Sequence, residues 1–413
     1  MFGHLQIPYR NERWLVGLAD AGLRVLTLFW SPLRSAAAST EPPKRILLLR
    51  LERVGDLVMV LDAIAMARQL APQAEIDLVV GSWNAGLARL IPSADSVEAL
   101  DVPWMAREGR GLTWPELIRR ARAWRTRRYD LAINFEPDIR TNLLLALSGA
   151  ARRVGFVSGG GGAVLSEGVV PDPGAHIAEN AKALVARAFA ATMDDRRWTI
   201  DDGRWTMDDR RWTMDDRRST LEIPEDARRR AAELIGRISP RGLTIGIQPA
   251  AGRQIKEWDP ARFAEVGAEL ARQRGAKIVL IGSAADRRAL DGVTAAWPPD
   301  VPPLVQLPVE TDLIVLSAVL ERLSLFITGD TGPMHLAAAV DTPVLAIFGP
   351  SLPTRYAPLS PKARIVRIDI PCSPCNLMRR PPERCVGHVP DCLAGIESAQ
   401  ILKAANEMLG IPN

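Results

Sequence analysis

Short apolar runs alternate with helix-like stretches in the first half of the chain. Runs at residues 45–50, 75–80 and 130–134 have the length of buried strands, and residues 114–124 before the third run have the pattern of a helix. Strands that alternate with helices predict a parallel, doubly wound sheet, because parallel strands need crossover connections.

The same alternation starts again in the second half. Apolar runs at residues 243–247, 277–281, 325–327 and 344–348 predict strands of a second parallel sheet. The sequence therefore predicts an α/β protein with two Rossmann-like, doubly wound domains facing a central cleft, and ligands at the carboxyl ends of the strands. The predicted boundaries are an N-terminal helix and linker (1–43), a first Rossmann-like domain (44–192), a repeat-containing linker (193–220), a second Rossmann-like domain (221–395) and a C-terminal helix (396–413).

The linker contains a seven-residue unit, Met-Asp-Asp-Arg-Arg-Trp-Thr, in four tandem and nearly identical copies. Repeat folds use units of about 20 residues or more, so a recent duplication within a linker is the preferred interpretation. Because seven residues match two helical turns, the linker is expected to be helical. A metal-binding acidic array or a docking motif is the alternative.

Residues 14–30 are mostly apolar, but Asp20 and Arg24 interrupt them, and the stretch is shorter than the roughly 20 residues that span a bilayer. Polar or small residues recur every three or four positions here and would form a stripe along a helix. This pattern predicts an amphipathic helix that lies on a membrane surface or on the protein body. The members of the stripe are Arg13, Gly17, Asp20, Arg24, Thr27 and Ser31. A secretory signal peptide is the rival, because residues 35–39 are small, although the two charges argue against it. A plain packing helix is the third alternative.

Composition narrows the classes of function. A hydrophobic content of 47% and 413 residues suit two globular domains, and a net charge of +4 with a pI near 9.0 suits an anionic ligand or membrane surface better than nucleic acid. With three Tyr and eight Phe, the chain has few platforms for stacking bases, so no nucleic-acid partner is expected. No cysteine lies outside residues 372–392, which indicates a reducing compartment.

Residues 329–339 carry the clearest binding signal. An apolar run leads into Gly329 and Asp330, and Thr331 then precedes a helix that contains His335. A strand, a glycine turn and a helix N-terminus place backbone N–H groups and a positive dipole end at one point, which predicts a phosphate site. The chain has no G-x-G-x-x-G or Walker A motif, so dinucleotide and P-loop chemistry are not supported.

Two further residues lie beyond predicted strand ends. Asp56 sits in the turn after the first strand, where it is either a general base or only a helix cap. Lys256 ends a loop of small residues after the first strand of the second domain, where it either binds a phosphate or is simply solvated.

The four cysteines, Cys372, Cys375, Cys385 and Cys392, include one pair with the spacing of zinc ligands. The second pair is more widely spaced than in a standard knuckle. A structural zinc site is therefore one interpretation, and reduced or locally disulfide-bonded cysteines are the other.

The chain resembles the family 9 glycosyltransferases, whose best-known members are the ADP-heptose:lipopolysaccharide heptosyltransferases. The resemblance extends from about residue 44 to about residue 409, apart from the repeat. It rests on four segments in the correct order, 50–56, 153–156, 256–258 and 329–335.

The resemblance implies a GT-B fold whose first domain holds the acceptor and whose second holds the nucleotide-sugar donor. It implies that Asp56 is the catalytic base and that Lys256 contacts the donor diphosphate. The implied phosphate-binding turn comprises Asp330, Thr331, Gly332 and His335. Asp286 is the nearest match to a ribose-binding carboxylate that is commonly Glu in the family, so the sequence departs from the pattern there. Cysteine clusters occur at this place in many members, which implies a structural role.

The implied activity is an inverting, metal-independent transfer of a sugar, with heptose from ADP-heptose as the expected donor, to a lipopolysaccharide core or related glycan. No cofactor is expected beyond the structural zinc named above. The protein is expected in the cytoplasm, peripherally associated with the inner membrane through its N-terminal helix and acting on a lipid-linked acceptor. A nucleotide-sugar epimerase and a non-catalytic nucleotide- or glycan-binding protein are the alternatives.

Overall fold

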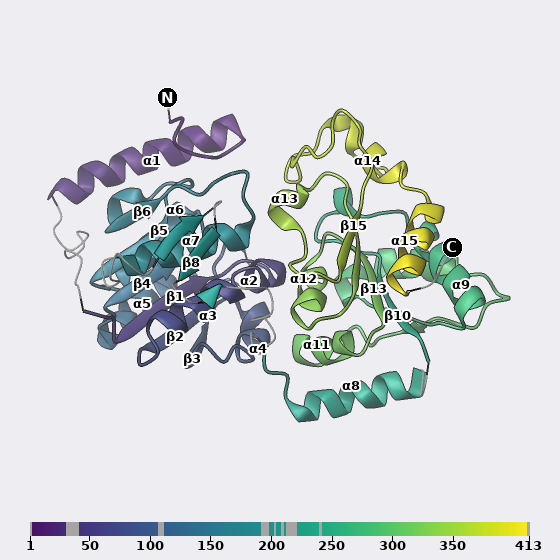
Figure 1. Cartoon of the computed structure of the whole chain (residues 1–413). Coiled ribbons are helices and arrows are strands. Elements are labelled where there is room, and N and C mark those ends of the chain that lie inside the picture. Colours follow the sequence, from purple (N-terminus) through teal and green to yellow (C-terminus); the bar gives the residue numbers. More distant parts are fainter. Residues whose placement is uncertain are drawn as a thin grey trace. The chain divides into compact units, whose positions relative to one another are not determined.

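The computed structural model describes residues 2–29, 41–105, 111–190, 198–201, 204–207, 210–211, 221–238 and 242–410. The chain divides into two compact units, Met1–Thr220 and Leu221–Asn413 (Figure 1).

The N-terminal unit is built on a six-stranded parallel sheet with the order β3-β2-β1-β4-β5-β6. Its strands are β1 (Arg45–Arg50), β2 (Glu75–Val80), β3 (Ser96–Ala99), β4 (Leu131–Asn134), β5 (Arg152–Phe156) and β6 (Glu167–Val169). The chain builds outward from β1 on one side and then returns to add β4 on the other side. This is the Rossmann order, and its switch point lies between β1 and β4.

Helices cover this sheet. They are α1 (Arg10–Phe29), α2 (Val54–Val58), α3 (Leu61–Leu70), α4 (Ala85–Ala88), α5 (Trp114–Ala123), α6 (Ile139–Leu147) and α7 (Ile177–Phe189), with 3₁₀ turns at Ser82–Asn84, Trp124–Arg127 and Gly162–Val164. Local signals fix their starts: Thr113 and Glu116 form a capping box on α5, and Asp138 accepts a hydrogen bond from the Arg140 N–H at 2.7 Å on α6.

The C-terminal unit repeats the architecture, with the order β12-β11-β10-β13-β14-β15 and every pairing parallel. Its strands are β10 (Thr244–Gln248), β11 (Lys277–Leu280), β12 (Val305–Gln306), β13 (Leu325–Gly329), β14 (Val344–Ile347) and β15 (Ala363–Val366). The switch point here lies between β10 and β13. Two doubly wound, Rossmann-like sheets are therefore confirmed.

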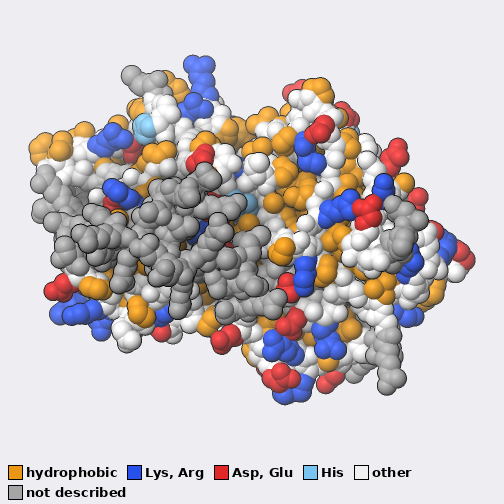
Figure 2. All heavy atoms as spheres, viewed as in Figure 1, with side chains coloured by type: hydrophobic (Ala, Val, Ile, Leu, Met, Phe, Trp, Pro, Cys, Tyr) orange, Lys and Arg blue, Asp and Glu red, His pale blue; other side chains and the backbone are white. Residues whose placement is uncertain are grey.

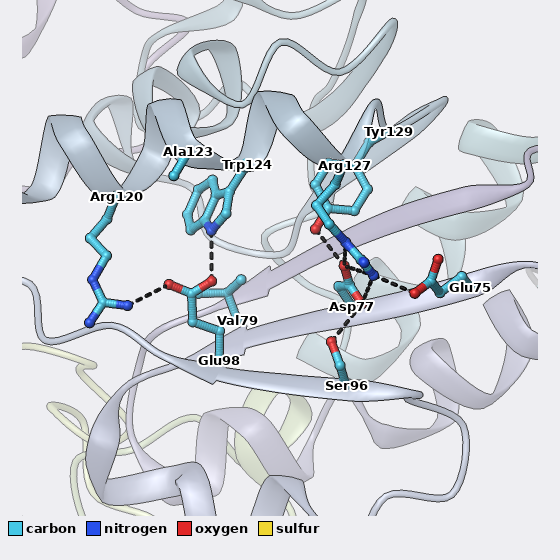
Figure 3. A pocket seen from close by; sticks show the side chains of 10 residues that line it. All are labelled: Glu75, Asp77, Val79, Ser96, Glu98, Arg120, Ala123, Trp124, Arg127 and Tyr129. Carbon is cyan, nitrogen blue, oxygen red and sulfur yellow. Dashed lines mark hydrogen bonds and ion pairs between the residues drawn. The ribbon is translucent and has the colours of Figure 1, made fainter.

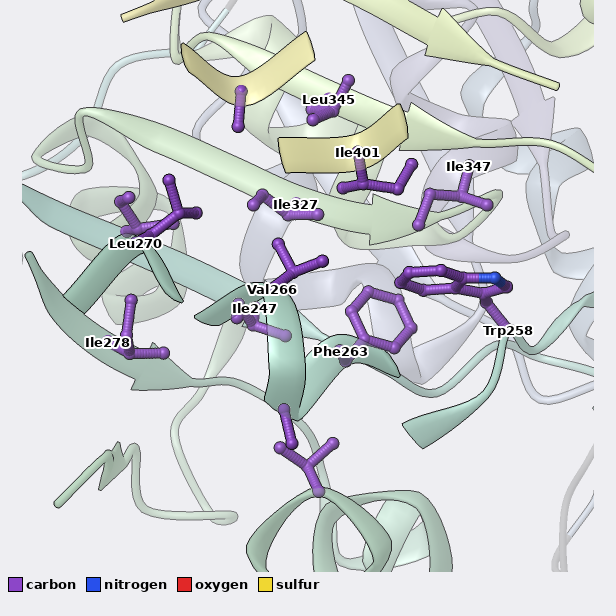
Figure 4. Close-up of a cluster of buried hydrophobic side chains, with 14 of the residues drawn as sticks. Ile247, Trp258, Phe263, Val266, Leu270, Ile278, Ile327, Leu345, Ile347 and Ile401 are labelled. Carbon is purple, nitrogen blue, oxygen red and sulfur yellow. The ribbon is translucent and has the colours of Figure 1, made fainter. Parts of the chain in front are cut away.

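Its helices are α8 (Glu225–Ile238), α9 (Pro260–Arg274), α10 (Arg287–Ala295), α11 (Leu313–Glu321), α12 (Gly332–Ala339), α13 (Pro353–Tyr356), α14 (Asp391–Ala394) and α15 (Ser398–Met408), with 3₁₀ turns at Gln254–Lys256, Ala284–Asp286 and Glu383–Cys385. The core lies between the sheet and α9 and α15 (Figure 4). Trp258 is its largest side chain: it packs edge-on against Phe263, with ring centroids 5.0 Å apart, and its indole N–H donates to the Ile396 carbonyl at 3.1 Å.

Part of the seven-residue repeat forms a small antiparallel sheet. Its strands are β7 (Trp198–Asp201), β8 (Arg204–Met207) and β9 (Arg210–Arg211). The expectation of a helix is wrong for these residues, because the Trp and Thr of each unit favour an extended backbone. The other residues of 193–220 lie outside the described part of the chain.

None of the helices that the structure describes combines the length and the hydrophobicity needed to cross a bilayer.

Candidate active site

Asp56 lies beyond the carboxyl end of β1, at the third position of α2. Its carboxylate accepts a hydrogen bond from the Arg53 backbone N–H at 3.2 Å, as in a capping box. Its side chain is still 27% exposed. The carboxylate therefore does cap α2, and it also remains accessible to a substrate, so the two interpretations are compatible.

Arg50 fixes the loop between β1 and Asp56 from inside. Its side chain is 2% exposed, and its guanidinium donates to the Phe135 carbonyl at 2.7 Å and to the Asp56 carbonyl at 3.2 Å. The same guanidinium pairs with the Glu52 carboxylate at 2.8 Å and lies 3.5 Å from the Asp56 carboxylate. A buried cation thus holds the backbone and the carboxylate of Asp56 in place.

Glu136 supports the same loop from the end of β4, across the switch point. One oxygen of its buried carboxyl accepts hydrogen bonds from the backbone N–H groups of Leu51 and Glu52. Burial raises the pKa of Glu136 well above its ordinary value; the charge of Glu52 adds to the shift and Arg50 only opposes it. The sequence did not reveal this residue, although its position directly after a predicted strand could have.

We expect Glu136→Ala to lower the free energy of unfolding by about 1–3 kcal/mol and to reduce turnover, since the buried N–H of Leu51 and the half-buried N–H of Glu52 lose their acceptor. Glu136→Gln keeps an oxygen acceptor and should be milder in both measurements. Thermal melts and initial rates of both variants test this. Equal losses in Glu136→Ala and Glu136→Gln would contradict the role of the acceptor oxygen.

The same pair of proteins tests the raised pKa. A carboxyl with a raised folded-state pKa binds its proton more tightly in the folded than in the unfolded chain. Its contribution to stability is therefore complete below the unfolded pKa and is lost as the pH rises through the folded pKa. Glu136→Gln cannot titrate, so its melting temperature relative to the wild type should increase as the pH rises above the ordinary pKa of a glutamate. A constant difference would contradict the shift.

In the C-terminal unit, Lys256 and Asp330 meet across the corresponding switch point, since one follows β10 and the other β13. The Lys256 ammonium donates to the Asp330 carbonyl at 2.8 Å and to its carboxylate at 3.0 Å. Their side chains are 16% and 10% exposed. The alternative of a merely solvated lysine is therefore wrong. The Ser351 hydroxyl, from the loop after β14, also donates to the Asp330 carboxylate.

Thr331 begins the helix that follows. Its hydroxyl accepts a hydrogen bond from the Met334 N–H at 3.2 Å and so caps α12, which starts at Gly332. The same hydroxyl is 3.4 Å from the Gln248 amide oxygen at the end of β10. The strand, turn and helix N-terminus are thus arranged as the phosphate-site prediction requires. His335 is buried in the first turns of α12.

Asp286 lies apart from this group. It follows β11, is half-buried, and accepts hydrogen bonds from the backbone N–H and the hydroxyl of Ser283, both at 2.8 Å. Asp286 thus lies after a strand end, where a ribose-binding carboxylate is expected, and it also caps the 3₁₀ turn at Ala284–Asp286. Its binding role stays a prediction.

The cysteine segment packs against the loop that carries Ser351. The Ser373 hydroxyl donates to the Gly349 carbonyl and the Asn376 N–H to the Pro350 carbonyl, both at 2.8 Å. The structure has all four cysteines as free thiols. Burial, together with the other three thiols, raises the pKa of Cys392 to about 11. Within the described residues no group of three or more His, Cys, Asp or Glu side chains is arranged as a metal site, and the zinc interpretation stays a prediction.

A cavity of about 510 Å³ lies against the face of β2 and β3, under α5 (Figure 3). Its charged side chains are paired with one another: Arg127 bonds Glu75 and Asp77, and Arg120 bonds Glu98 at 3.3 Å. Asp77 also accepts from Tyr129, and Glu98 accepts from the Trp124 indole at 2.8 Å. Burial and the bond to Asp77 raise the pKa of Tyr129. None of the predicted site residues lines it, so we regard it as a structural charge network.

Comparisons with known proteins agree with this geometry. The family model described as glycosyltransferase family 9 (heptosyltransferase) matches residues 117–385. Lipopolysaccharide heptosyltransferase 2 of Salmonella typhimurium is 27% identical over 327 residues, 78% of this chain and 88% of that protein. The Escherichia coli protein of the same name is 26% identical with the same coverage.

Solved structures show the same fold. The E. coli ADP-heptose lipopolysaccharide heptosyltransferase II superimposes with a TM-score of 0.69 at 23% identity, over 88% of this chain and 98% of that one. The family 9 glycosyltransferase of Veillonella parvula gives 0.70 at 22% identity, over 91% and 99%. The GT-B architecture is thereby confirmed, and neither the epimerase nor the binding-protein alternative is favoured. The chain belongs to glycosyltransferase family 9, the heptosyltransferases.

Proposed function

We propose that this glycosyltransferase is an inverting enzyme that transfers heptose from ADP-heptose to a lipopolysaccharide core at the cytoplasmic face of the inner membrane. One observation carries the proposal: Lys256 and Asp330 are paired at the N-terminus of α12, where an ammonium and the positive end of a helix dipole would both favour a diphosphate. Heptose and the acceptor are inferred from the names of the relatives, which are lipopolysaccharide heptosyltransferases, and ADP is inferred from the name of the E. coli ADP-heptose enzyme of the same fold.

In the proposed mechanism, Asp56 removes the proton from an acceptor hydroxyl, and the oxygen attacks the anomeric carbon from the face opposite the diphosphate. The new glycosidic bond forms as the bond to the diphosphate breaks, so the configuration inverts. Negative charge that grows on the diphosphate is stabilised by Lys256 and by the dipole of α12. Asp330 uses two of the three N–H groups of the Lys256 ammonium, which leaves the third for a phosphate oxygen. The scheme needs no divalent metal.

Thermal shift of the purified chain with ADP, UDP, GDP or CDP tests the donor. We expect ADP alone to stabilise the protein, by about 2.7 kcal/mol at a hundredfold excess over its Kd. Stabilisation by another nucleoside diphosphate would be compatible with a glycosyltransferase but would overturn ADP-heptose as the donor. No response to any of the four would overturn the diphosphate site.

A transfer assay tests the reaction itself. With ADP-heptose and a heptose-deficient lipopolysaccharide core, we expect ADP release and a product heavier by one heptose, both dependent on the acceptor. Conversion of the donor at the same rate without acceptor would contradict the transferase and favour an epimerase.

A further inference from the structure

Helix α1 lies on the N-terminal unit (Figure 1), and the middle of its polar stripe faces that unit. Gly17 and Asp20 are its buried residues. The Asp20 carboxylate accepts a hydrogen bond from the Gly161 backbone N–H at 2.8 Å, and it pairs with Arg24 at 3.0 Å. A buried carboxylate bonded to the body of the unit fixes which side of the helix faces out.

The segment before the helix reinforces this orientation. The Gln6 backbone N–H donates to the Ser158 carbonyl, and its side-chain amide donates to the Pro171 carbonyl, both at 2.9 Å. Leu5 is buried beside these contacts. The helix is thus attached at its middle and through the residues that precede it.

The outward side of α1 is apolar. Most of the large exposed hydrophobic side chains in the described part of the chain belong to it: Trp14, Leu15, Leu18, Val25, Leu26, Leu28 and Phe29. Leu15 is 70% exposed and Phe29 is 84% exposed. At 3.6 residues per turn these positions cover about half of the circumference, which is much wider than the seam of a coiled coil. In Figure 2 hydrophobic side chains gather on the part of the N-terminal unit where this helix lies.

The charges on α1 distinguish the kinds of partner. Its acidic residues, Glu12 and Asp20, are half-buried and buried, and Arg24 pairs with Asp20, whereas Arg10 is exposed. The outward side therefore combines a broad apolar surface with the exposed cation Arg10 and without an exposed carboxylate. Interfacial helices on anionic lipid have this composition.

We infer that the outward face of α1 binds an anionic lipid bilayer, with the helix lying in the interface and the N-terminal unit behind it. The inference goes beyond the proposed transfer reaction and depends neither on the donor nor on the acceptor.

Flotation of the full chain with vesicles tests it, in the absence of any sugar nucleotide. We expect binding to phosphatidylcholine vesicles that contain phosphatidylglycerol, weaker binding to phosphatidylcholine alone, and weakening by salt. Leu15→Glu/Leu18→Glu should lower the partition coefficient by about tenfold or more, because two apolar side chains no longer enter the interface. Arg10→Gln should lower it about fivefold on the anionic vesicles only.

Val170→Glu is the matched control, since Val170 is 64% exposed on the same unit but lies outside α1. It should bind vesicles like the wild type. ADP-induced thermal shifts, measured on every variant, report the donor site separately and should be unchanged. The inference would be overturned if the wild-type protein bound neither the anionic nor the phosphatidylcholine vesicles. It would also be overturned if the Leu15→Glu/Leu18→Glu variant bound the anionic vesicles as well as the wild type does. If the wild type were a dimer and the Leu15→Glu/Leu18→Glu variant a monomer, the outward face of α1 would instead bind a second copy of the chain.

Discussion

Asp56→Asn should lower the turnover number about 10²- to 10⁴-fold while leaving ADP affinity unchanged, because an amide cannot take the proton of the acceptor hydroxyl. The substitution is informative because the Asn oxygen can still accept the hydrogen bond from the Arg53 N–H that closes the capping box. The fold and the first turn of α2 should therefore survive. Initial rates with ADP-heptose and titration with ADP measure the two quantities.

Asp138→Asn is the control for this experiment. Asp138 also caps a helix at a strand end of the N-terminal unit, and its side chain is 24% exposed. The conservative exchange removes a charge and keeps a cap, so turnover should stay within about threefold of the wild type. If Asp56→Asn kept near-normal turnover, Asp56 would not be the base. If both variants lost activity equally, the effect would come from the caps or from lost charge in general.

Lys256→Met should reduce kcat/KM about 10²- to 10³-fold, because the diphosphate would leave without its cation. ADP should also bind more weakly, and the melting temperature should fall because the nearly buried Asp330 carboxylate loses its ion pair. Lys256→Arg keeps the charge with a different donor geometry and is expected to recover only part of the activity.

A double variant distinguishes the contribution of Lys256 to folding stability from its contribution to the reaction. Lys256→Met/Asp330→Asn removes both charges, so most of the lost stability should return while activity remains low. Lys277→Met, at the exposed start of β11, controls for the loss of a positive charge from the unit. Recovery of activity together with stability in the double variant would show that Lys256 serves the fold and not the diphosphate.

Hydrophobic patterning was sufficient to predict both sheets through seven of their strands, because strands buried on both faces read as continuous apolar runs. It missed the strands β3, β5, β6, β12 and β15. It did not give the strand order, which depends on where each crossover returns. Asp56, Lys256, Asp330 and Thr331 were recognisable because strand–turn–helix junctions are local signals.

The residues that the sequence did not reveal act over long distances along the chain. Glu136 and Ser351 contact the loop and the carboxylate that they support only after the sheets have formed. The polar stripe of α1 was visible in the sequence, but its inward direction was not, since it depends on the bond between Asp20 and Gly161. The repeat was misjudged because its period was weighed above the strand preference of Trp and Thr.

The contacts across the two switch points also constrain how the site forms during synthesis. Glu136 is 85 residues from Leu51 along the chain, and Lys256 is 74 residues from Asp330. Helix α2 has five residues and is too short to be stable alone. In a nascent chain whose strand β4 has not yet emerged from the ribosome, the loop that carries Asp56 therefore lacks its hydrogen bonds to Phe135 and Glu136. Each half of the site matures only when its fourth strand docks beside its first, so ribosome-bound fragments that end before that strand should be inert.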